Sequence, residues 1–279
     1  MNEWSNWSGS VRAQPAEIAR PRDEADVCEA VQRAARLRVT GASHSFMPLC
    51  ETDGVLVSLA DVEDALRVAP DRRTVDAPAG WSLSRLTAAL WEEGLSLPNQ
   101  GDVNPQSLAG AIGTGTHGTG RDLGSLSTLA RAFRLAAADG RIVECSAVQN
   151  PDLFEAARLS LGMVGVATRI TIDVLPAFRL EERIEKRPLA WVVENFAEIA
   201  ASHRHAEFFV FPFSDHVLLK TLHPTEAADV RPKPALNEDA VFGFCCDLVR
   251  AAPWLVGPLQ RFMTRAADAS HRIGPAYEI

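Results

Sequence analysis

Apolar side chains recur every three or four residues in several parts of the chain, a spacing that predicts amphipathic helices. The segment 23–38 starts with carboxylates, places Val27, Ala30 and Val31 on one helical face, and leads into a short strand before His44. Further helices are expected at 82–93, at 151–159 with proline in the first turn, and around 190–201.

Shorter apolar runs between these helices predict strands. They lie at 54–59, 73–77, 132–138, 141–145 and 166–175, with a longer β-like run at 207–222. Asp139 and Gly140 separate two of them and supply the positive φ angles of a two-residue hairpin turn. The mixture indicates an α+β fold, and the change of pattern after Pro176 indicates a second domain.

Two stretches follow neither period, and the first is residues 38–46. Gly41 lets the chain turn there, and small neighbours would let backbone N–H groups approach an anion such as a pyrophosphate. Those neighbours are Thr40, Ala42, Ser43 and Ser45. His44 would then lie beside the bound group. A polar turn with a solvent-facing histidine is the alternative, and this stretch alone does not decide between them.

The second stretch, residues 99–120, is rich in glycine. Glycine at this density weakens an ordinary helix or a central strand, so we expect tight turns and close approach of the backbone to a ligand. A flexible linker is the alternative. The interleaved Leu108, Ala109 and Ile112 are too apolar for a solvated spacer.

With both stretches in view, the chain resembles flavoproteins of the vanillyl-alcohol-oxidase type. The similar branch contains the sugar-1,4-lactone oxidases (gulonolactone and arabinonolactone oxidases) and the alditol oxidases. Residues 38–45 match its Arg-x-x-Gly-x-x-His-Ser pattern, and residues 101–120 match its Gly-Asp-x-x-x-Gln-x-x-Ala-Gly and Thr-His-Gly-Thr-Gly patterns. Further matches lie at 6–9, 160–166 and 207–212. No Gly-x-Gly-x-x-Gly opens a helix after a first strand, so the chain does not resemble a Rossmann protein.

The resemblance implies a two-subdomain FAD-binding domain of the PCMH type over residues 1–175. An incomplete α+β cap domain would follow over residues 176–279, with its C-terminal remainder absent. Relatives continue through a His-Trp-x-Lys segment, and this sequence has no His-Trp pair. We therefore expect a second polypeptide to complete the cap and active site, with a homodimer as the lesser possibility.

The resemblance also assigns roles to residues. The implied FAD-binding positions are Thr40, Gly41, Ala42, Ser43, His44, Ser45, Gly101, Asp102, Ser107, Gly110, Thr114, Gly115, Thr116, His117 and Val166. His44 matches a histidine bonded covalently to the 8α-methyl group of the flavin. Asp102 matches a position beside the reactive face and is the candidate catalytic residue. Gly101 matches a position that leaves oxygen a route to the reduced flavin, unless it only serves the turn before Asp102.

The implied reaction is oxidation of a CH–OH group of a sugar-1,4-lactone or alditol. Hydride passes to flavin N5, and oxygen reoxidises the flavin and gives hydrogen peroxide. The alternatives are a non-catalytic flavin-binding protein and a truncated inactive homologue. In the cap, the substrate pocket is a candidate location for Glu207, Phe209, Phe211 and Lys220. A half-buried sheet core is the favoured interpretation of these alternating aromatics.

Composition excludes several other classes of protein. With 279 residues, 47% of them hydrophobic, the chain can bury a sizeable core. A formal net charge of −8 argues against a nucleic-acid partner, and no basic run suggests a membrane surface. The N-terminus lacks the basic start and apolar core of a signal peptide, so a cytoplasmic location is expected.

The five cysteines are odd in number and scattered, which fits reduced thiols better than a disulfide framework. They are Cys28, Cys50, Cys145, Cys245 and Cys246. Metal binding by the last two with a histidine is the alternative, and the candidate partners are His203, His205 and His271. Because no Cys-x-x-Cys or His-Glu-x-x-His is present, no metal is expected.

Overall fold

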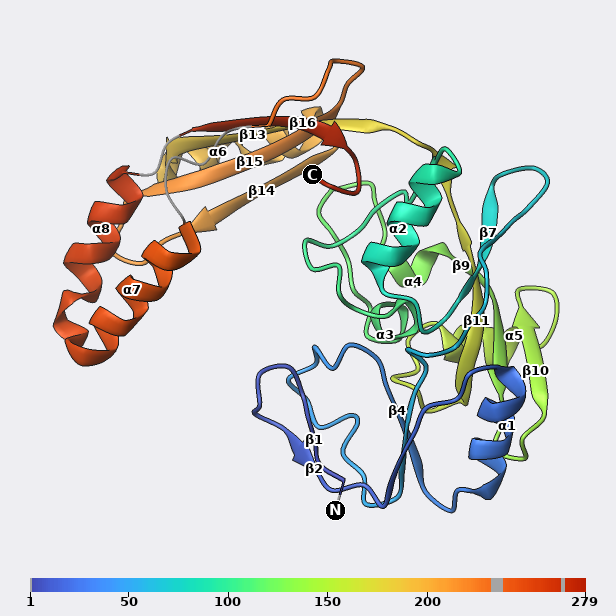
Figure 1. Ribbon diagram of the computed structural model, residues 1–279. Coiled ribbons are helices and arrows are strands. Elements are labelled where there is room, and N and C mark those ends of the chain that lie inside the picture. The colour runs from blue at the N-terminus through green and yellow to red at the C-terminus, as the bar shows by residue number, and fades with distance from the viewer. Residues whose placement is uncertain (1, 232–237, 267–268) are drawn as a thin grey trace. The chain divides into compact units, whose positions relative to one another are not determined.

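The computed structural model describes residues 2–231, 238–266 and 269–279 (Figure 1). The chain divides into two compact units. The first comprises Met1–Gly118 and Leu123–Ala177, and the second comprises Thr119–Asp122 and Phe178–Ile279. Both mix helices and strands, which confirms the α+β class. The functional boundary after residue 175 stays a prediction.

The first unit begins with a small parallel layer. Its strands run in the order β3 (Glu17–Ala19), β5 (Val55–Ser58) and β4 (Leu37–Thr40). Helix α1 (Glu24–Arg33) joins β3 to β4 and packs Val27 and Ala30 against this layer. Asp23 caps the helix by accepting a hydrogen bond from the Asp26 N–H at 2.9 Å. A hairpin of β1 (Trp4–Ser5) and β2 (Arg12–Ala13) precedes it.

The second layer of this unit is an antiparallel sheet with strand order β10-β9-β11-β7-β6. Its strands are β6 (Arg67–Val68), β7 (Thr74–Pro78), β9 (Ala130–Ala136), β10 (Ile142–Ser146) and β11 (Val166–Asp173). The hairpin expected around Gly140 is confirmed, with a φ of +77° at that glycine. A short pair joins β8 (Leu95–Ser96) to β12 (Leu175–Pro176).

Four helices pack on this sheet and close the main core. They are α2 (Leu83–Glu92), α3 (Leu108–Gly113), α4 (Leu126–Leu129) and α5 (Pro151–Ala157). The expectation that residues 99–120 contain no helix is wrong for α3. Ser107 caps it, and burial of Leu108, Ala111 and Ile112 outweighs the helix-weakening effect of its glycines.

An ion pair ties the two layers of the first unit together. Glu24 on α1 accepts hydrogen bonds from the guanidinium of Arg134 on β9 at 2.6 and 2.8 Å. The Thr168 hydroxyl donates a third at 2.8 Å. The hydrogen bonds from Arg134, with further help from Thr168, hold the pKa of the Glu24 carboxyl below its usual value despite partial burial.

The second unit is built on a four-stranded antiparallel sheet of order β14-β15-β13-β16. Its strands are β13 (Arg179–Pro188), β14 (His205–Val210), β15 (His216–Pro224) and β16 (Ser270–Pro275). Helix α6 (Leu189–Ser202) covers one face and packs Val192 against Val217 and Leu219. The β-like run expected at 207–222 is therefore two strands joined by a turn.

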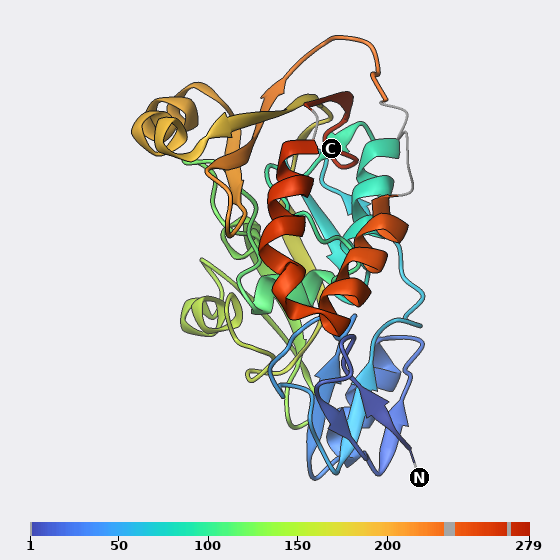
Figure 2. The same cartoon turned by 90° about the vertical axis from the view of Figure 1, so that its left-hand side faces the viewer.

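Strands β13 and β16 and the helical segments after β15 lie outside the helices and strands expected from sequence. Helices α7 (Glu238–Ala251) and α8 (Val256–Ala266) lie side by side, linked by the short 3-10 helix η1 (Pro253–Leu255) (Figure 2). The segment Thr119–Asp122 joins the sheet because Nδ1 of buried His205 lies 3.0 Å from the Thr119 carbonyl oxygen. No described helix is both long and apolar enough to cross a membrane.

Candidate cofactor site

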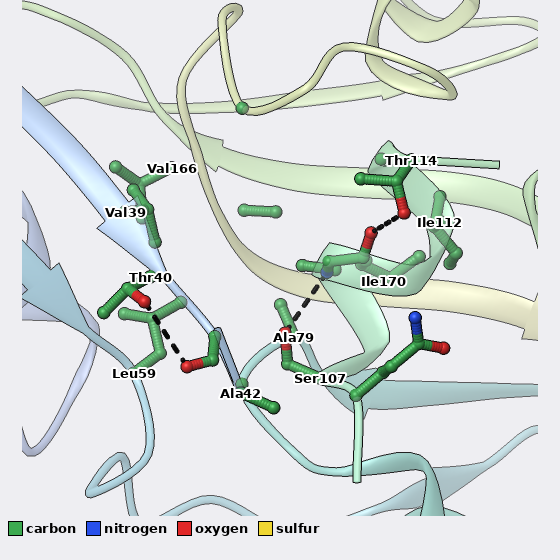
Figure 3. A pocket seen from close by; sticks show the side chains of 18 of the residues that line it. Val39, Thr40, Ala42, Leu59, Ala79, Ser107, Ile112, Thr114, Val166 and Ile170 are labelled. Carbon is green, nitrogen blue, oxygen red and sulfur yellow. Dashed lines mark hydrogen bonds between the residues drawn. The ribbon is translucent and has the colours of Figure 1, made fainter. Parts of the chain in front are cut away.

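A cavity of about 500 Å³ lies within the first unit (Figure 3). It is bounded by the end of β4, the loop after it, the helix α3 and the start of β11. This volume is within the ordinary range for small-molecule and cofactor sites. The two stretches that the sequence analysis singled out thus line one cavity.

The closest approach of these two stretches is at Gly41 and Ser107. A β-carbon at Gly41 would overlap the Ser107 Oγ atom and lie 2.9 Å from the Ser107 Cβ atom. Ser107 Oγ in turn accepts a hydrogen bond from the Gly110 N–H at 3.3 Å (Figure 3). Only glycine fits at position 41 without displacing the start of α3.

The backbone of residues 42–45 is arranged to meet an anion. Within the described chain, no hydrogen bond is found from the N–H groups of these four residues. Ser43 has a φ of +59°, and its hydroxyl lies 3.0 Å from that of Thr40 (Figure 3). Successive N–H groups in such a left-handed turn form a concave anion site.

The helix α3 does not provide such a site, although its N-terminus lies at the cavity. The Leu108 N–H donates to the Trp81 carbonyl at 2.8 Å, and the Ala109 N–H donates to the Ala79 carbonyl at 2.9 Å. With Ser107 Oγ on Gly110, the first helical donors are already satisfied. An anion is therefore expected at the loop of residues 42–45.

The walls of the cavity are mostly apolar and carry no carboxylate. Val39, Leu59, Ile112 and Ile170 are among the residues that line it (Figure 3). Arg85 is the one arginine among the lining residues, and its guanidinium lies 4.0 Å from the centre of the Trp81 ring. Such walls suit a flat aromatic group attached to a negatively charged one.

Two buried polar atoms at the cavity have no hydrogen-bond partner among the described residues. They are Nε1 of Trp81 and Oε1 of Gln106, a donor and an acceptor. A buried polar group without a partner is costly, so a bound group with polar edges would stabilise both. Trp81 was not predicted from the sequence, and the Ala-Gly-Trp sequence after β7 was the available signal. Gln106 is part of the matched Gly-Asp-x-x-x-Gln-x-x-Ala-Gly pattern, but no cofactor role was predicted for it.

The residues predicted to bind a cofactor fall into two sets. Those lining the cavity are Thr40, Gly41, Ala42, Ser43, His44, Ser45, Ser107, Gly110, Thr114 and Val166. Those that do not line it are Gly101, Asp102, Gly115, Thr116 and His117. The second set keeps its cofactor-binding and catalytic roles only as predictions.

Backbone contacts explain Gly101 of the second set and also Gly118, which follows His117. A β-carbon at Gly101 would lie 3.1 Å from the His117 carbonyl oxygen, tighter than an ordinary contact. One at Gly118 would overlap the Gln100 carbonyl oxygen. Asp102 and His117 are exposed, and His117 Nδ1 lies 2.9 Å from the carbonyl oxygen of Gly118. This agrees with the alternative in which Gly101 serves a tight turn.

The candidate residues of the cap lie on the sheet of the second unit. Lys220 Nζ lies 3.2 Å from a carboxylate oxygen of Glu207, its cross-strand neighbour. Phe208 packs beneath α6, edge-on to Phe196, whereas Phe209 is 43% exposed. The core interpretation is therefore wrong for Phe209; its neighbour Phe208, for which no expectation was stated, packs in the core instead, because successive strand residues face opposite sides.

All five cysteines are free thiols. Cys50 lines the cavity, and burial raises the pKa of its thiol, with its Sγ 3.3 Å from the Val39 carbonyl oxygen. A protonated thiol is a weak nucleophile. Within the described residues, no group of three or more His, Cys, Asp or Glu side chains is placed to hold a metal ion.

Two family models match the chain. Residues 15–146 match the FAD binding domain, and residues 170–279 match D-arabinono-1,4-lactone oxidase. The L-gulono-1,4-lactone dehydrogenase of Mycobacterium tuberculosis is 34% identical over 289 aligned residues, covering 99% of this chain and 66% of that protein. The L-gulonolactone oxidase of Mus musculus is 32% identical, covering 77% of this chain and 50% of that protein.

Among solved structures, a cholesterol oxidase from Brevibacterium sterolicum aligns with a TM-score of 0.77 at 18% identity. The alignment covers 99% of this chain and 60% of that one, and it shows the fold alone. The chain thus spans less than two thirds of the length of each of these relatives.

The cavity fits the FAD that the first family model implies. The loop of residues 42–45 offers free N–H groups to a pyrophosphate, the walls offer apolar surface to a ring, and Trp81 and Gln106 offer polar contacts. The resemblance seen in the sequence is confirmed. The chain combines an FAD binding domain, matched in residues 15–146, with a D-arabinono-1,4-lactone oxidase region, matched in residues 170–279, and it is similar to sugar-lactone oxidases and dehydrogenases.

Proposed function

We propose that this chain is an FAD-dependent oxidoreductase, or the flavin-bearing part of one, acting on a CH–OH group of a sugar-1,4-lactone or alditol. The observation that carries the proposal is the cavity in which the loop after β4 meets α3. The names of the relatives supply the substrate class. The FAD isoalloxazine, when bound, accepts a hydride from the carbon being oxidised.

The residues of the cavity divide the work of holding FAD. The N–H groups of residues 42–45 bind the pyrophosphate, and Gly41 lets that loop approach Ser107. Apolar walls such as Ile112 and Ile170 exclude water from the ring. Trp81 Nε1 donates to, and Gln106 Oε1 accepts from, polar edges of the cofactor.

We further propose that His44 is bonded covalently to FAD. It lines the cavity, where the other nucleophile, the Cys50 thiol, is held protonated by burial. The bond would join a nitrogen of the His44 imidazole to the 8α-carbon of the ring system, with one proton lost from the methyl group and one from that imidazole nitrogen. The two electrons released pass to dioxygen, which takes up two protons and leaves as hydrogen peroxide.

Reoxidation during turnover is proposed to use dioxygen, which makes the enzyme an oxidase. The support is the match of Gly101 to a family position that leaves oxygen a route, although a β-carbon there would lie 3.1 Å from the His117 carbonyl oxygen. The relatives include both a dehydrogenase and an oxidase. Asp102 is proposed as the catalytic residue; its side chain is exposed and lies outside the cavity lining.

A second polypeptide, or a second copy of this chain, is proposed to cover part of the second unit. Large apolar side chains of its helices are exposed, namely Phe242, Phe244, Trp254 and Phe262 at 63–76%. Exposed apolar surface of this kind favours a covering partner. A cytoplasmic location is proposed as well, supported by five free thiols, three of which have a pKa raised chiefly by burial.

The chain purified with FAD tests these proposals together. We expect a flavin absorption spectrum, reduction of that spectrum by L-gulono-, L-galactono- or D-arabinono-1,4-lactone or by xylitol without air, and hydrogen peroxide when air returns. Native mass measurement reports any covering chain. A bound flavin that no lactone or alditol reduces would favour the non-catalytic alternative. Reoxidation by a dye and not by dioxygen would identify a dehydrogenase.

A further inference from the structure

The loop that carries His44 is held from outside the cavity by the N-terminal hairpin. The strands β1 and β2 pair, and the turn between them contains Asn6 and Trp7. The Trp7 N–H donates to the Ser43 carbonyl at 2.9 Å. The hairpin thus contacts the residue directly before His44.

The side chain of Asn6 adds a hydrogen bond between the hairpin and the loop that carries His44. Its side chain is 4% exposed, and its Nδ2 lies 3.0 Å from the Ser45 carbonyl oxygen and 3.1 Å from the hydroxyls of Ser8 and Ser10. Its Oδ1 accepts a hydrogen bond from the Val11 N–H at 3.0 Å. One buried amide therefore joins both arms of the hairpin to the residue directly after His44.

The backbone on the other side of His44 is in an unfavourable conformation. Ser43 has a φ of +59°, a region that side chains other than glycine seldom occupy. Such a conformation persists at a site where its surroundings over-determine it. Here the Trp7 N–H and the Thr40 hydroxyl hold Ser43.

Trp7 also contacts the His44 ring itself. The two ring centres are 5.3 Å apart and the planes are inclined by 18°, an offset stack. Phe46 lies edge-on to the same indole at 6.3 Å. Trp7 is 66% exposed, so it contributes little to the core, and its ring contacts are made to the histidine loop.

We propose that Trp7 is a positioning residue for the attachment of FAD. By stacking on the imidazole it fixes the plane of the His44 ring, and by its N–H it fixes the backbone before that ring. The inference rests on the proposed bond between His44 and FAD, and it assigns to the N-terminal hairpin a role in forming that bond. Of the two groups joined by the proposed bond, His44 and FAD, Trp7 contacts only His44.

The test compares Trp7→Ala, Trp7→Phe and a matched control, Trp191→Ala, which removes a tryptophan that is 41% exposed in the second unit. Each apoprotein is mixed with FAD, and the flavin that stays with acid-precipitated protein is followed over time. We expect Trp7→Ala to slow adduct formation about tenfold, the effect of releasing one side chain that was held in place. Trp7→Phe should recover most of the rate, and total FAD bound should stay unchanged in all three.

A second measurement needs no flavin. In protein labelled at its seven histidines, the His44 ring signal is assigned by its loss in His44→Ala. Its protons should lie upfield because of the indole ring current, and Trp7→Ala should abolish that displacement while Trp191→Ala leaves it. An unchanged His44 signal in Trp7→Ala would overturn the stacking in solution.

The two proposals fail in different ways. An adduct that forms at the wild-type rate in Trp7→Ala overturns the role of Trp7 and leaves the bond at His44 standing. Wild-type protein that binds FAD without any adduct overturns that bond and this role of Trp7 together. Loss of total FAD binding in Trp7→Ala, with no recovery in Trp7→Phe, would assign Trp7 to the fold of the loop instead.

Discussion

The two units bury charged side chains in different places. In the first unit the buried Arg169 lies 2.6 Å from Asp76 and also pairs with Asp64, while the cavity lining carries no carboxylate. In the second unit Lys220 lies on the sheet face opposite α6, between Glu182 and Glu207. One unit keeps its acids away from its cavity, and the other buries them beside a lysine on one face of its sheet.

This difference in the placement of buried charges indicates which unit can bind an anionic aromatic cofactor. A cavity free of carboxylates does not repel a pyrophosphate, and its apolar walls need no charge to hold an aromatic ring. On the sheet of the second unit, the buried acids and the lysine are paired with one another. The comparison places the candidate FAD cavity in the first unit and a buried ion-pair cluster in the second.

Removal of Arg169 is expected to give the largest effect. Its guanidinium also donates to the carbonyl oxygens of Ala65 and Asp76. Arg169→Met therefore removes one hydrogen-bond donor group from two carboxylates and two carbonyl oxygens. We expect a loss of about 2–4 kcal/mol of unfolding free energy, because the carboxylates remain partly exposed. Urea unfolding of the full chain, followed by tryptophan fluorescence, measures it.

The matched variant in the other unit is Lys220→Met. Glu182 keeps Arg272 at 3.7 Å after this change, as Asp64 and Asp76 keep Arg67 at 3.4 and 3.6 Å after Arg169→Met. Because Arg169 also donates to two backbone carbonyl oxygens, the loss from Lys220→Met is expected to be smaller, about 1–2 kcal/mol. If Lys220→Met costs more than Arg169→Met, the second unit depends more on its buried charges than the first, and the comparison is reversed.

The next effect is on cofactor affinity. In Gly41→Ala the new methyl group overlaps Ser107 Oγ, and relieving such overpacking costs about 1–3 kcal/mol. We therefore expect FAD to bind roughly tenfold or more weakly, as measured by titration with flavin fluorescence. Gly243→Ala is the control, since nothing lies within 4 Å of that position. If Gly41→Ala binds FAD with wild-type affinity, the close approach of Gly41 to Ser107 is not needed for FAD binding.

The smallest expected effect is on how the melting temperature of the protein depends on pH. The Arg134 guanidinium lowers the pKa of Glu24, so the contribution of this carboxylate is present above its ordinary pKa near 4.5. It is lost as pH falls through the lower pKa of the folded protein. Glu24→Gln should flatten the fall in melting temperature between about pH 5 and pH 3. A parallel fall in both proteins would assign the acid sensitivity to other carboxylates.

Local periodicity predicted much of the first unit. The helix that became α2 ends before Gly94 as expected, and the hairpin around Gly140 has the expected turn. The pattern failed at residues 34–40, where the apolar spacing continues although the helix ends at Arg33 and β4 begins at Leu37. Tertiary pairing of β4 with β5 decided that boundary, and no local signal carries it.

The cofactor site was predictable in part for a related reason. Gly41, His44 and Ser107 stand out because their types are unusual at those places in the sequence. Trp81 and Gln106 do not, because a buried polar atom without a partner exists only once the fold is formed. The contact of Trp7 with His44 joins residues 37 positions apart in the sequence and depends on the hairpin.

The contact between His205 and the Thr119 carbonyl affects the order in which parts of the second unit can fold during synthesis. The second unit is discontinuous in sequence. Its segment Thr119–Asp122 is synthesised within the first unit, before His205 on β14, its contact 86 positions later. During synthesis, residues 119–122 are therefore a loop that cannot dock until the second sheet is translated. A gene fragment that starts at residue 178 encodes a sheet without this docking segment, so dissecting the protein requires both pieces in one chain or in one cell.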